Sequence, residues 1–345
     1  MTAEAQLDRT TADNHFRLGL MFAVSSALAF GSSGPFAKAL MESGWSPTAA
    51  VTARLAGGAL MMAVFASIVR PGWVREVLGH AKTVVGYGLI PIAGAQLCYY
   101  NAVAHLSVGV ALLLEYTAPI LVVGWVWATT RHRPSATTFA GVAVAIAGII
   151  LVLDVFSGAQ INLAGVSWGL AAAVCAACYF MMSNQASTDG EGLSPISLAA
   201  GGLVVGTAAV TLLGVTGVMP LTFTTNAVTI AGHTTAWLVP VIALGLIPTA
   251  LAYTLGIVGI ARLKPRFASL VGLSEVLFAV LIAWIMLGEA MSVSQAIGGA
   301  VVLVGLAVAR QGDRSEQADP HTATQVELAT WPDMAIQETS EPGID

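Results

Sequence analysis

The feature that most constrains this chain is a succession of apolar segments, each about as long as a membrane is thick. A helix needs roughly 20 apolar residues to cross the hydrocarbon core of a bilayer. Composition agrees, because 56% of the residues are hydrophobic and only 10% are charged, whereas soluble domains carry about 25% charged residues. We therefore predict an all-α membrane protein with ten transmembrane helices, at the approximate spans Leu18–Ala39, Ser46–Val69, Thr83–Ala104, Ser107–Thr129, Ala136–Leu153, Ala164–Ser183, Pro195–Gly217, Thr235–Val258, Phe267–Leu287 and Met291–Ala309.

The basic residues indicate how these spans are oriented. Lys and Arg favour the cytoplasmic side of short loops. With ten spans and the N-terminus inside, twelve of the fourteen basic residues lie on the cytoplasmic side, while Lys38 lies near the outer side and Arg54 falls within a span. Residues 1–17 are then a cytoplasmic N-terminal tail. Residues 311–345 are acidic and rich in Thr, Gln and Pro, which predicts a disordered cytoplasmic C-terminal tail.

The two halves of the chain resemble each other. Residues 88–91 and 245–248 share the tetrapeptide Gly-Leu-Ile-Pro, at an offset of 157 residues. Residues 44–47 (Gly-Trp-Ser-Pro) match residues 192–195 (Gly-Leu-Ser-Pro) at an offset of 148. Each half holds five predicted helices, and because five is odd, the second half enters the membrane from the opposite side. Residues 18–154 and 164–310 are therefore predicted to be two inverted five-helix repeats, the usual construction of secondary transporters.

Two stretches of sequence resemble a known family. LLLEYTAPILVVGWVW, which contains Glu115 and Pro119, is similar to the fourth helix of the EamA-type branch of the drug/metabolite transporter superfamily. The sequence from Leu270 to Ala309 is similar to its ninth and tenth helices, although Val276 stands where the family often has proline. The resemblance covers about residues 17–310. It implies export or import of small metabolites, commonly amino acids, without ATP.

Motifs that would indicate an enzyme are missing from the sequence. It contains neither a Gly-rich phosphate loop ending in Gly-Lys-Ser/Thr nor a His-Glu-x-x-His motif. The histidines form no cluster in the sequence, so we predict no metal site and no cofactor. Cys98, Cys175 and Cys178 lie in apolar segments and imply no disulfide framework. Cys175 and Cys178 are one helical turn apart, which fits a helix contact, with a metal or redox pair as the alternative.

Three ionisable residues fall inside predicted spans, where each costs at least about 2.5 kcal/mol at the bilayer centre. Arg54 and Glu115 each lie eight residues into a helix that enters from outside, roughly 12 Å deep. We predict that they form an ion pair in at least one conformation. Glu275 lies at a mirror-related depth, and its repeat equivalent, Ala118, shares a helix face with Glu115. No base matches Glu275, so its carboxyl suits a proton-coupled site; a structural role is the alternative interpretation.

Other polar or aromatic side chains within the spans are candidates for lining a substrate cavity. The ones that we single out are Gln96, Tyr99, Tyr100, Asn101, Tyr116, Tyr253 and Ser274, with Ser32, Ser33, Thr117, Tyr179 and Asn184 as further possibilities. Aromatic side chains at helix ends are often interfacial anchors instead.

Two further sets of residues suggest structural roles. The tryptophans Trp125, Trp127 and Trp284 are interpreted as anchors that face the lipid. In the closing helix of each half, a pair of glycines recurs at a seven-residue spacing: Gly141 and Gly148, and Gly298 and Gly305. Such glycines let helices approach closely, so they predict packing surfaces rather than a site.

The sequence as a whole predicts a secondary transporter of the inner membrane that moves a small polar metabolite by alternating access. The resemblance implies efflux of an amino acid or related compound, with proton coupling or exchange. The alternative class is a non-transporting membrane protein, such as a receptor or a lipid-modifying enzyme. The expected partners are a small-molecule substrate and the lipid bilayer, with no nucleic acid, and the expected state is a monomer or homodimer.

The predicted orientation has a direct test. We expect a reporter enzyme that works only in the cytoplasm to be active when it is fused after Gln311, because twelve basic residues lie on that side. A reporter that works only in the periplasm should be inactive at the same position. Paired fusions of a cytoplasm-active and a periplasm-active enzyme at this position measure it. Activity of the periplasmic reporter alone would reverse the orientation.

Overall fold

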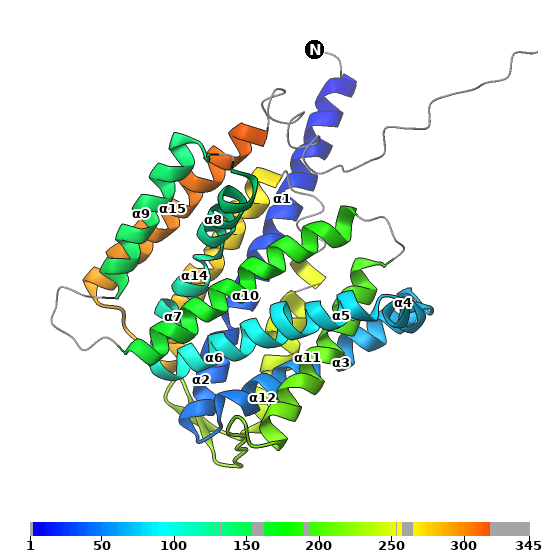
Figure 1. Ribbon diagram of the computed structural model, residues 1–345, viewed down its shortest axis with the longest axis vertical. Helices are drawn as coiled ribbons and strands as arrows, with labels where there is room; N and C mark the ends of the chain where they lie inside the picture. The colour runs from blue at the N-terminus through cyan, green and yellow to red at the C-terminus, as the bar shows by residue number, and fades with distance from the viewer. Residues whose placement is uncertain are drawn as a thin grey trace, which may run out of the picture.

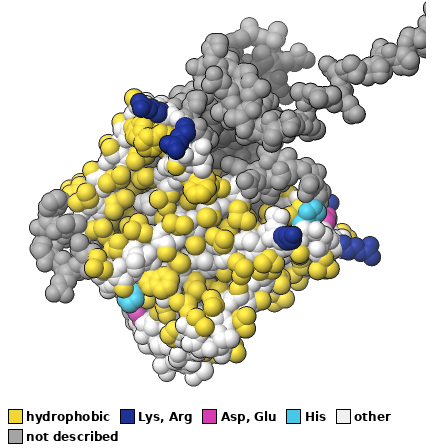
Figure 2. Space-filling view, viewed as in Figure 1, with side chains coloured by type: hydrophobic (Ala, Val, Ile, Leu, Met, Phe, Trp, Pro, Cys, Tyr) yellow, Lys and Arg dark blue, Asp and Glu magenta, His cyan; other side chains and the backbone are white. Residues whose placement is uncertain are grey.

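The structure is a computed structural model, in which residues 3–131, 133–153, 162–188, 193–252, 254–256 and 265–317 are described. This part of the chain is mostly helical. Six helical runs are long and apolar enough to cross a membrane: Arg17–Glu42, Pro47–Val69, Val108–Thr129, Leu163–Met182, Pro195–Val215 and Leu238–Gly256. Shorter apolar helices cover Ala136–Val152, Val271–Leu287 and Val293–Ala309. Hydrophobic side chains cover most of the face in Figure 2, as a surface in contact with lipid requires.

The helices follow one another along the chain with short connections (Figure 1). The first half contains α1 (Ala3–Gly31), α2 (Ser33–Glu42), α3 (Pro47–Val69), α4 (Trp73–Gly79), α5 (Ala81–Tyr87), η1 (Gly88–Gly94), α6 (Ala95–His105), α7 (Val108–Glu115), α8 (Ala118–Thr130) and α9 (Ala136–Val152). The second half contains α10 (Leu163–Thr188), α11 (Pro195–Val215), β1 (Val228–Ile230), β2 (His233–Thr235), α12 (Leu238–Gly245), η3 (Leu246–Leu251), α14 (Pro265–Leu287) and α15 (Val293–Gln317).

The repeated Gly-Leu-Ile-Pro tetrapeptide produces the same local structure in both halves. Residues Gly88–Gly94 and Leu246–Leu251 are each a short π-helix, and each contains the proline of the tetrapeptide. Proline lacks the N–H that an α-helix needs in its interior, and a wider turn is one way to accommodate it. Equivalent sequence therefore gives equivalent backbone at positions 157 residues apart.

The packing of the helices also repeats between the halves. Helix α1 packs against η3 and α14, while α10 packs against η1, α7 and α8. Helix α3 packs against η3, and α11 packs against η1. The pairs α3 with α11 and α9 with α15 join the halves directly. Exchanging the halves maps this set of contacts onto itself, which is what two structurally equivalent units packed about a pseudo-two-fold axis would give.

Two of the predicted spans are interrupted. The first is divided into α1 and α2 at Ser32, with Pro35 in the new first turn. The fourth is divided into α7 and α8 at Tyr116 and Thr117, with a proline at the start of α8. Its repeat equivalent, α14, runs from Pro265 to Leu287 without a break. Since Pro119 corresponds to Val276, the difference in sequence accounts for the difference in structure.

The N-termini of α3 and α11 lie at equivalent positions, and each is held by a segment of the other half. Ser46 caps α3, and its hydroxyl also accepts a hydrogen bond from the N–H of Thr222 at 3.0 Å. Ser194 caps α11, and its N–H donates to the carboxylate of Glu76 at 3.2 Å. The Ser197 hydroxyl donates to the same carboxylate at 2.6 Å. The hydrogen bonds from Ser197 and Ser194 hold the pKa of Glu76 below its usual range.

One predicted boundary is wrong. The eighth span was expected to begin at Thr235, but Thr235 is the last residue of strand β2, and α12 begins at Leu238. Strands β1 and β2 form an antiparallel hairpin. The hairpin lies in the longer connection between α11 and α12, where β-branched threonines favour an extended backbone.

The glycine pairs in α9 and α15 are packing surfaces, as predicted. These two helices lie side by side in Figure 1 and share the most extensive contact of any helix pair in the described chain. A Cβ added at Gly148 would lie 2.6 Å from the backbone N of Val302, and one added at Gly298 would lie 2.6 Å from the backbone N of Val152. Both backbones therefore approach through the glycines. The tryptophans Trp125, Trp127 and Trp284 are exposed on the surface, consistent with contact with lipid.

Replacing one of these glycines should destabilise the protein. We expect Gly148→Ala to lower the free energy of unfolding by about 1–3 kcal/mol, because the added methyl group overlaps the backbone of α15. The melting temperature in detergent measures the effect. Gly124→Ala is the matched control, since a Cβ at Gly124 meets nothing within 4 Å. Equal melting temperatures for the two variants would contradict this account of the α9–α15 contact.

Candidate functional site

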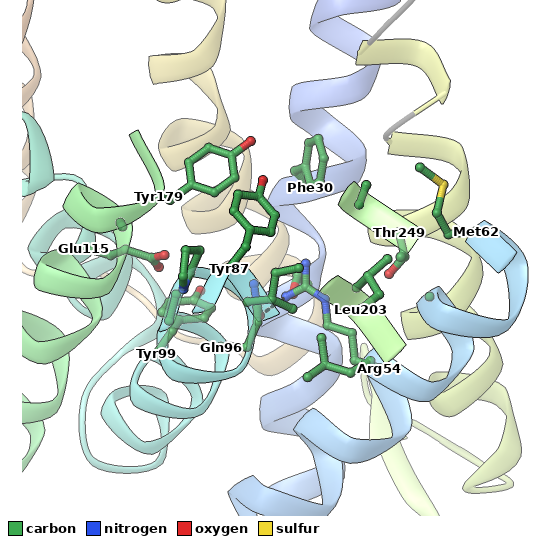
Figure 3. A pocket seen from close by; sticks show the side chains of 18 of the residues that line it. Phe30, Arg54, Met62, Tyr87, Gln96, Tyr99, Glu115, Tyr179, Leu203 and Thr249 are labelled. Atoms are coloured by element: carbon green, nitrogen blue, oxygen red, sulfur yellow. Dashed lines mark hydrogen bonds between the residues drawn. The ribbon is translucent and has the colours of Figure 1, made fainter. Parts of the chain in front are cut away.

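A cavity of about 1060 Å³ lies inside the bundle (Figure 3). Its walls come from both halves of the chain, and include residues of α1, α3, α6, α7, α11 and α14. It reaches from Ser33, at the break between α1 and α2, and Glu275, within α14, to Phe65 near the end of α3 and Pro195 at the start of α11. That end of the bundle carries Arg70 and Arg75, so the charge distribution predicts that the cavity extends towards the cytoplasm.

Arg54 is buried at the wall of this cavity and is held by polar side chains of α6. Its guanidinium donates hydrogen bonds to Oε1 of Gln96 and to the hydroxyl of Tyr100, the latter at 3.3 Å. The Tyr100 hydroxyl also shares a hydrogen bond of 2.9 Å with the Ser33 hydroxyl, next to the break between α1 and α2. A positive charge is thereby oriented at the cavity by a network that joins three helices.

Glu115 faces the same cavity from another side (Figure 3). The predicted ion pair with Arg54 is not formed in this conformation: between described side chains, the salt bridges are Lys38–Glu289 and Arg70–Glu76. Among the described residues, no group donates a hydrogen bond to the Glu115 carboxyl. The pair stays a prediction for another conformation. In this one, a guanidinium and a carboxyl both face the cavity without contacting each other.

Glu275 has a partner that the sequence did not indicate. The Tyr116 hydroxyl donates a hydrogen bond to its Oε2 at 2.7 Å and lies 3.0 Å from the backbone oxygen of Gly272. The sequence offers no base to match Glu275, and the partner in the structure is a neutral hydroxyl. Tyr116 can reach α14 because it occupies the break between α7 and α8. One hydrogen bond thus joins the interrupted helix of the first half to the continuous helix of the second.

The remaining sequence candidates are placed as follows. Gln96 and Tyr99 line the cavity. Tyr100 is fully buried behind Arg54. Asn101 and Ser274 lie outside the lining and donate hydrogen bonds to carbonyls of their own helices. Tyr253 lies outside the described residues.

Several lining residues were missed by the sequence analysis because they are apolar. On α3 these include Gly58, Met62 and Phe65, which follow Arg54 at intervals of three or four residues. That spacing keeps side chains on one face of a helix. Extending the helical spacing from each charged candidate would have found them. Tyr87 and Phe30 were also missed, whereas Tyr179, a candidate from the sequence, lies in the same aromatic wall (Figure 3).

The chain is similar in sequence to known membrane transporters. The model of the EamA-like transporter family matches it twice, over residues 17–154 and 163–310. The threonine/homoserine exporter RhtA of Escherichia coli K12 is 26% identical over 260 residues, covering 73% of this chain and 78% of the exporter. An uncharacterized transporter of Archaeoglobus fulgidus is 26% identical over 271 residues, covering 76% and 91%. One crystal structure has a similar fold, with a TM-score of 0.54 and 20% identity, covering 85% of this chain and 98% of that chain.

The hydrogen bond between Tyr116 and Glu275 can be measured by a double-mutant cycle. We expect Tyr116→Phe and Glu275→Met to be coupled by about 1–3 kcal/mol in the free energy of unfolding, because each removes the same bond. Thermal unfolding of the four proteins in detergent gives the coupling. The control cycle pairs Tyr99→Phe with Glu275→Met, which share no hydrogen bond and should be additive. Additivity in both cycles would rule out a stabilising bond.

Proposed function

The chain belongs to the EamA-like transporter family, and from that premise we propose that it is a secondary carrier that moves a small polar metabolite across the inner membrane by alternating access. The observation that carries this proposal is a cavity within the helices that contains one guanidinium and two carboxyl groups. Ionisable groups at such depth are costly, and in membrane proteins they commonly mark a substrate or ion pathway.

The chemistry of the cavity favours a zwitterionic substrate of the amino-acid class. The Arg54 guanidinium can bind a carboxylate, and Gln96 and Tyr100 hold it in place for that purpose. The Glu115 carboxyl can bind an ammonium group, which would supply the hydrogen bonds that the described protein groups do not make. The name of the related RhtA exporters, threonine/homoserine exporter, supports the same class and the direction of efflux.

Glu275 is the residue that we assign to coupling. A carboxyl group in the cavity can take up and release a proton, and the Tyr116 hydroxyl stabilises its ionised form. Because that hydrogen bond joins the two halves, a change in the protonation of Glu275 would change the contact between α7 and α14. Proton movement and rearrangement of the halves are thereby linked through one bond.

The architecture that we propose is two inverted five-helix repeats, residues 18–154 and 164–310, with ten spans and both termini in the cytoplasm. The two matches of the family model, over residues 17–154 and 163–310, support these boundaries. The π-helices that recur in the two halves support the repeat. The set of helix contacts supports it too, because exchanging the halves leaves that set unchanged. An odd number of spans per repeat makes the second half inverted.

Transport by purified protein in liposomes tests the proposal. We expect uptake of one or more zwitterionic amino acids from a pooled set, with threonine and homoserine included as probes. Glu115→Gln should lower that uptake at least about tenfold, because an amide cannot pair with an ammonium group as a carboxylate does. Glu275→Gln should leave the protein folded while removing the response of a proton-sensitive dye. Ser274→Ala is the control, since Ser274 neighbours Glu275 in sequence but lies outside the cavity lining.

Two results would contradict the assignment of roles. Normal uptake by Glu115→Gln would remove that carboxyl from substrate binding. An unchanged dye response in Glu275→Gln would return Glu275 to a structural role.

A further inference from the structure

The ends of the bundle differ in how they are closed, and the outer end is closed by an ion pair. Lys38 of α2 and Glu289, in the turn between α14 and α15, form a salt bridge. Their side chains are only 17% and 19% exposed. By the charge distribution this end faces outside, opposite the end towards which the cavity extends.

Both charged groups also hold the start of α7. The Lys38 ammonium donates a hydrogen bond to the backbone oxygen of Leu106 at 2.9 Å, and Oε2 of Glu289 accepts one from the N–H of Val108 at 3.1 Å. A carboxylate at the N-terminus of a helix is favoured by the helix dipole. The four groups therefore tie α2, the junction of α6 with α7, and the turn after α14. We call the Lys38–Glu289 pair with these two hydrogen bonds the outer clamp.

Close packing lies between the outer clamp and the cavity. A Cβ added at Gly34 would lie 2.5 Å from Cγ1 of Val108, and one added at Gly109 would lie 2.6 Å from Cγ2 of Val280. Helix α2 begins at Ser33, which lines the cavity, and reaches Lys38 five residues later, roughly 7.5 Å along the axis. The helices that bear the clamp are therefore the helices that bear the cavity wall.

The clamp has no equivalent in the other repeat. At the offsets of 148 and 157 residues, Lys38 corresponds to Ala186 and Glu289 corresponds to His132. An acid–base pair that joins the two halves is thus encoded at this end, whereas the Arg70–Glu76 pair at the other end lies within the first half. In a carrier built from two equivalent halves, a tie at one end stabilises the state in which that end is closed.

Resting on the proposed function, we propose that the outer clamp is a gate that biases the carrier towards the conformation whose cavity faces the cytoplasm. Opening the outer end separates α2 from α7 and α14, which breaks the ion pair and both backbone hydrogen bonds. Removing one charge then lowers the cost of the outward-facing conformation and raises its population.

Accessibility of a reporter cysteine measures that population without relying on transport. In the full chain with Cys98, Cys175 and Cys178 replaced by serine, Ala95→Cys places a thiol in the cavity wall. Intact cells are treated with a membrane-impermeant maleimide from outside. We expect Lys38→Met and Glu289→Gln each to raise the labelling rate about tenfold, which corresponds to about 1.4 kcal/mol. The charge exchange Lys38→Glu with Glu289→Lys should recover part of the original protection.

The controls separate the clamp from a general loosening of the fold. Arg70→Met breaks a more exposed ion pair elsewhere in the bundle and should leave the labelling rate unchanged. Glu289→Gln keeps an oxygen that can accept the hydrogen bond from the Val108 N–H, so we expect this variant to fold. It tests the ion pair if Lys38→Met fails to reach the membrane. A labelling rate in both single variants equal to that of the parent would overturn the gate. If labelling responds while no tested metabolite moves through the parent protein, the proposed function falls and the gate stands.

Discussion

In the hydrocarbon core of a bilayer no water is available to hydrogen-bond an unpaired backbone N–H or C=O group, so a chain can leave the helical conformation there only where the protein satisfies it. The two interrupted helices show how this is done. At each break a hydroxyl donates to the carbonyl three residues earlier, Ser32 to Ala29 and Thr117 to Leu114, both at 2.6 Å. Both breaks adjoin residues of the cavity wall. Irregular backbone and the candidate site therefore coincide because the cavity is where such backbone is tolerated.

The same lack of water distinguishes the three ionisable residues of the site by the hydrogen bonds that the protein gives them. Arg54 is held by Gln96 and Tyr100, and Glu275 accepts a hydrogen bond from Tyr116. Glu115 receives no hydrogen bond from a described group, and it lines the same cavity as the Arg54 guanidinium. A group left in that condition inside a membrane is stabilised by binding a cation or by taking up a proton. We therefore expect Glu115 to be the carboxyl that binds the cationic group of a ligand.

Much of this could be predicted from sequence because it depends on local pattern. The length of the apolar segments predicted the helices. The presence of Pro119 in one repeat and Val276 at the equivalent position of the other distinguishes the broken helix from the continuous one. The partners in the site could not be predicted, because they join residues distant in the chain. Tyr116 and Glu275 are 159 residues apart. Arg54 contacts Gln96 here, and its contact with Glu115 stays a prediction for another conformation, because sequence does not specify one state. The apolar wall was not predicted because only charged, polar and aromatic side chains distinguish themselves within apolar spans.

The two halves differ in the middle of the bundle, where α7 and α8 are separated by a break and α14 is continuous, and they differ again at its ends. The caps at Ser46 and Ser194 occupy equivalent positions, yet one is held by a loop backbone and the other by the Glu76 carboxylate. The change of offset from 148 to 157 places nine additional residues in the connection that forms the hairpin β1–β2. If the two end states of a carrier were related by perfect symmetry, they would have equal energy. Any difference in energy between them must therefore come from the places where the halves differ: the break between α7 and α8, and the ends, where charge, loop length and capping differ.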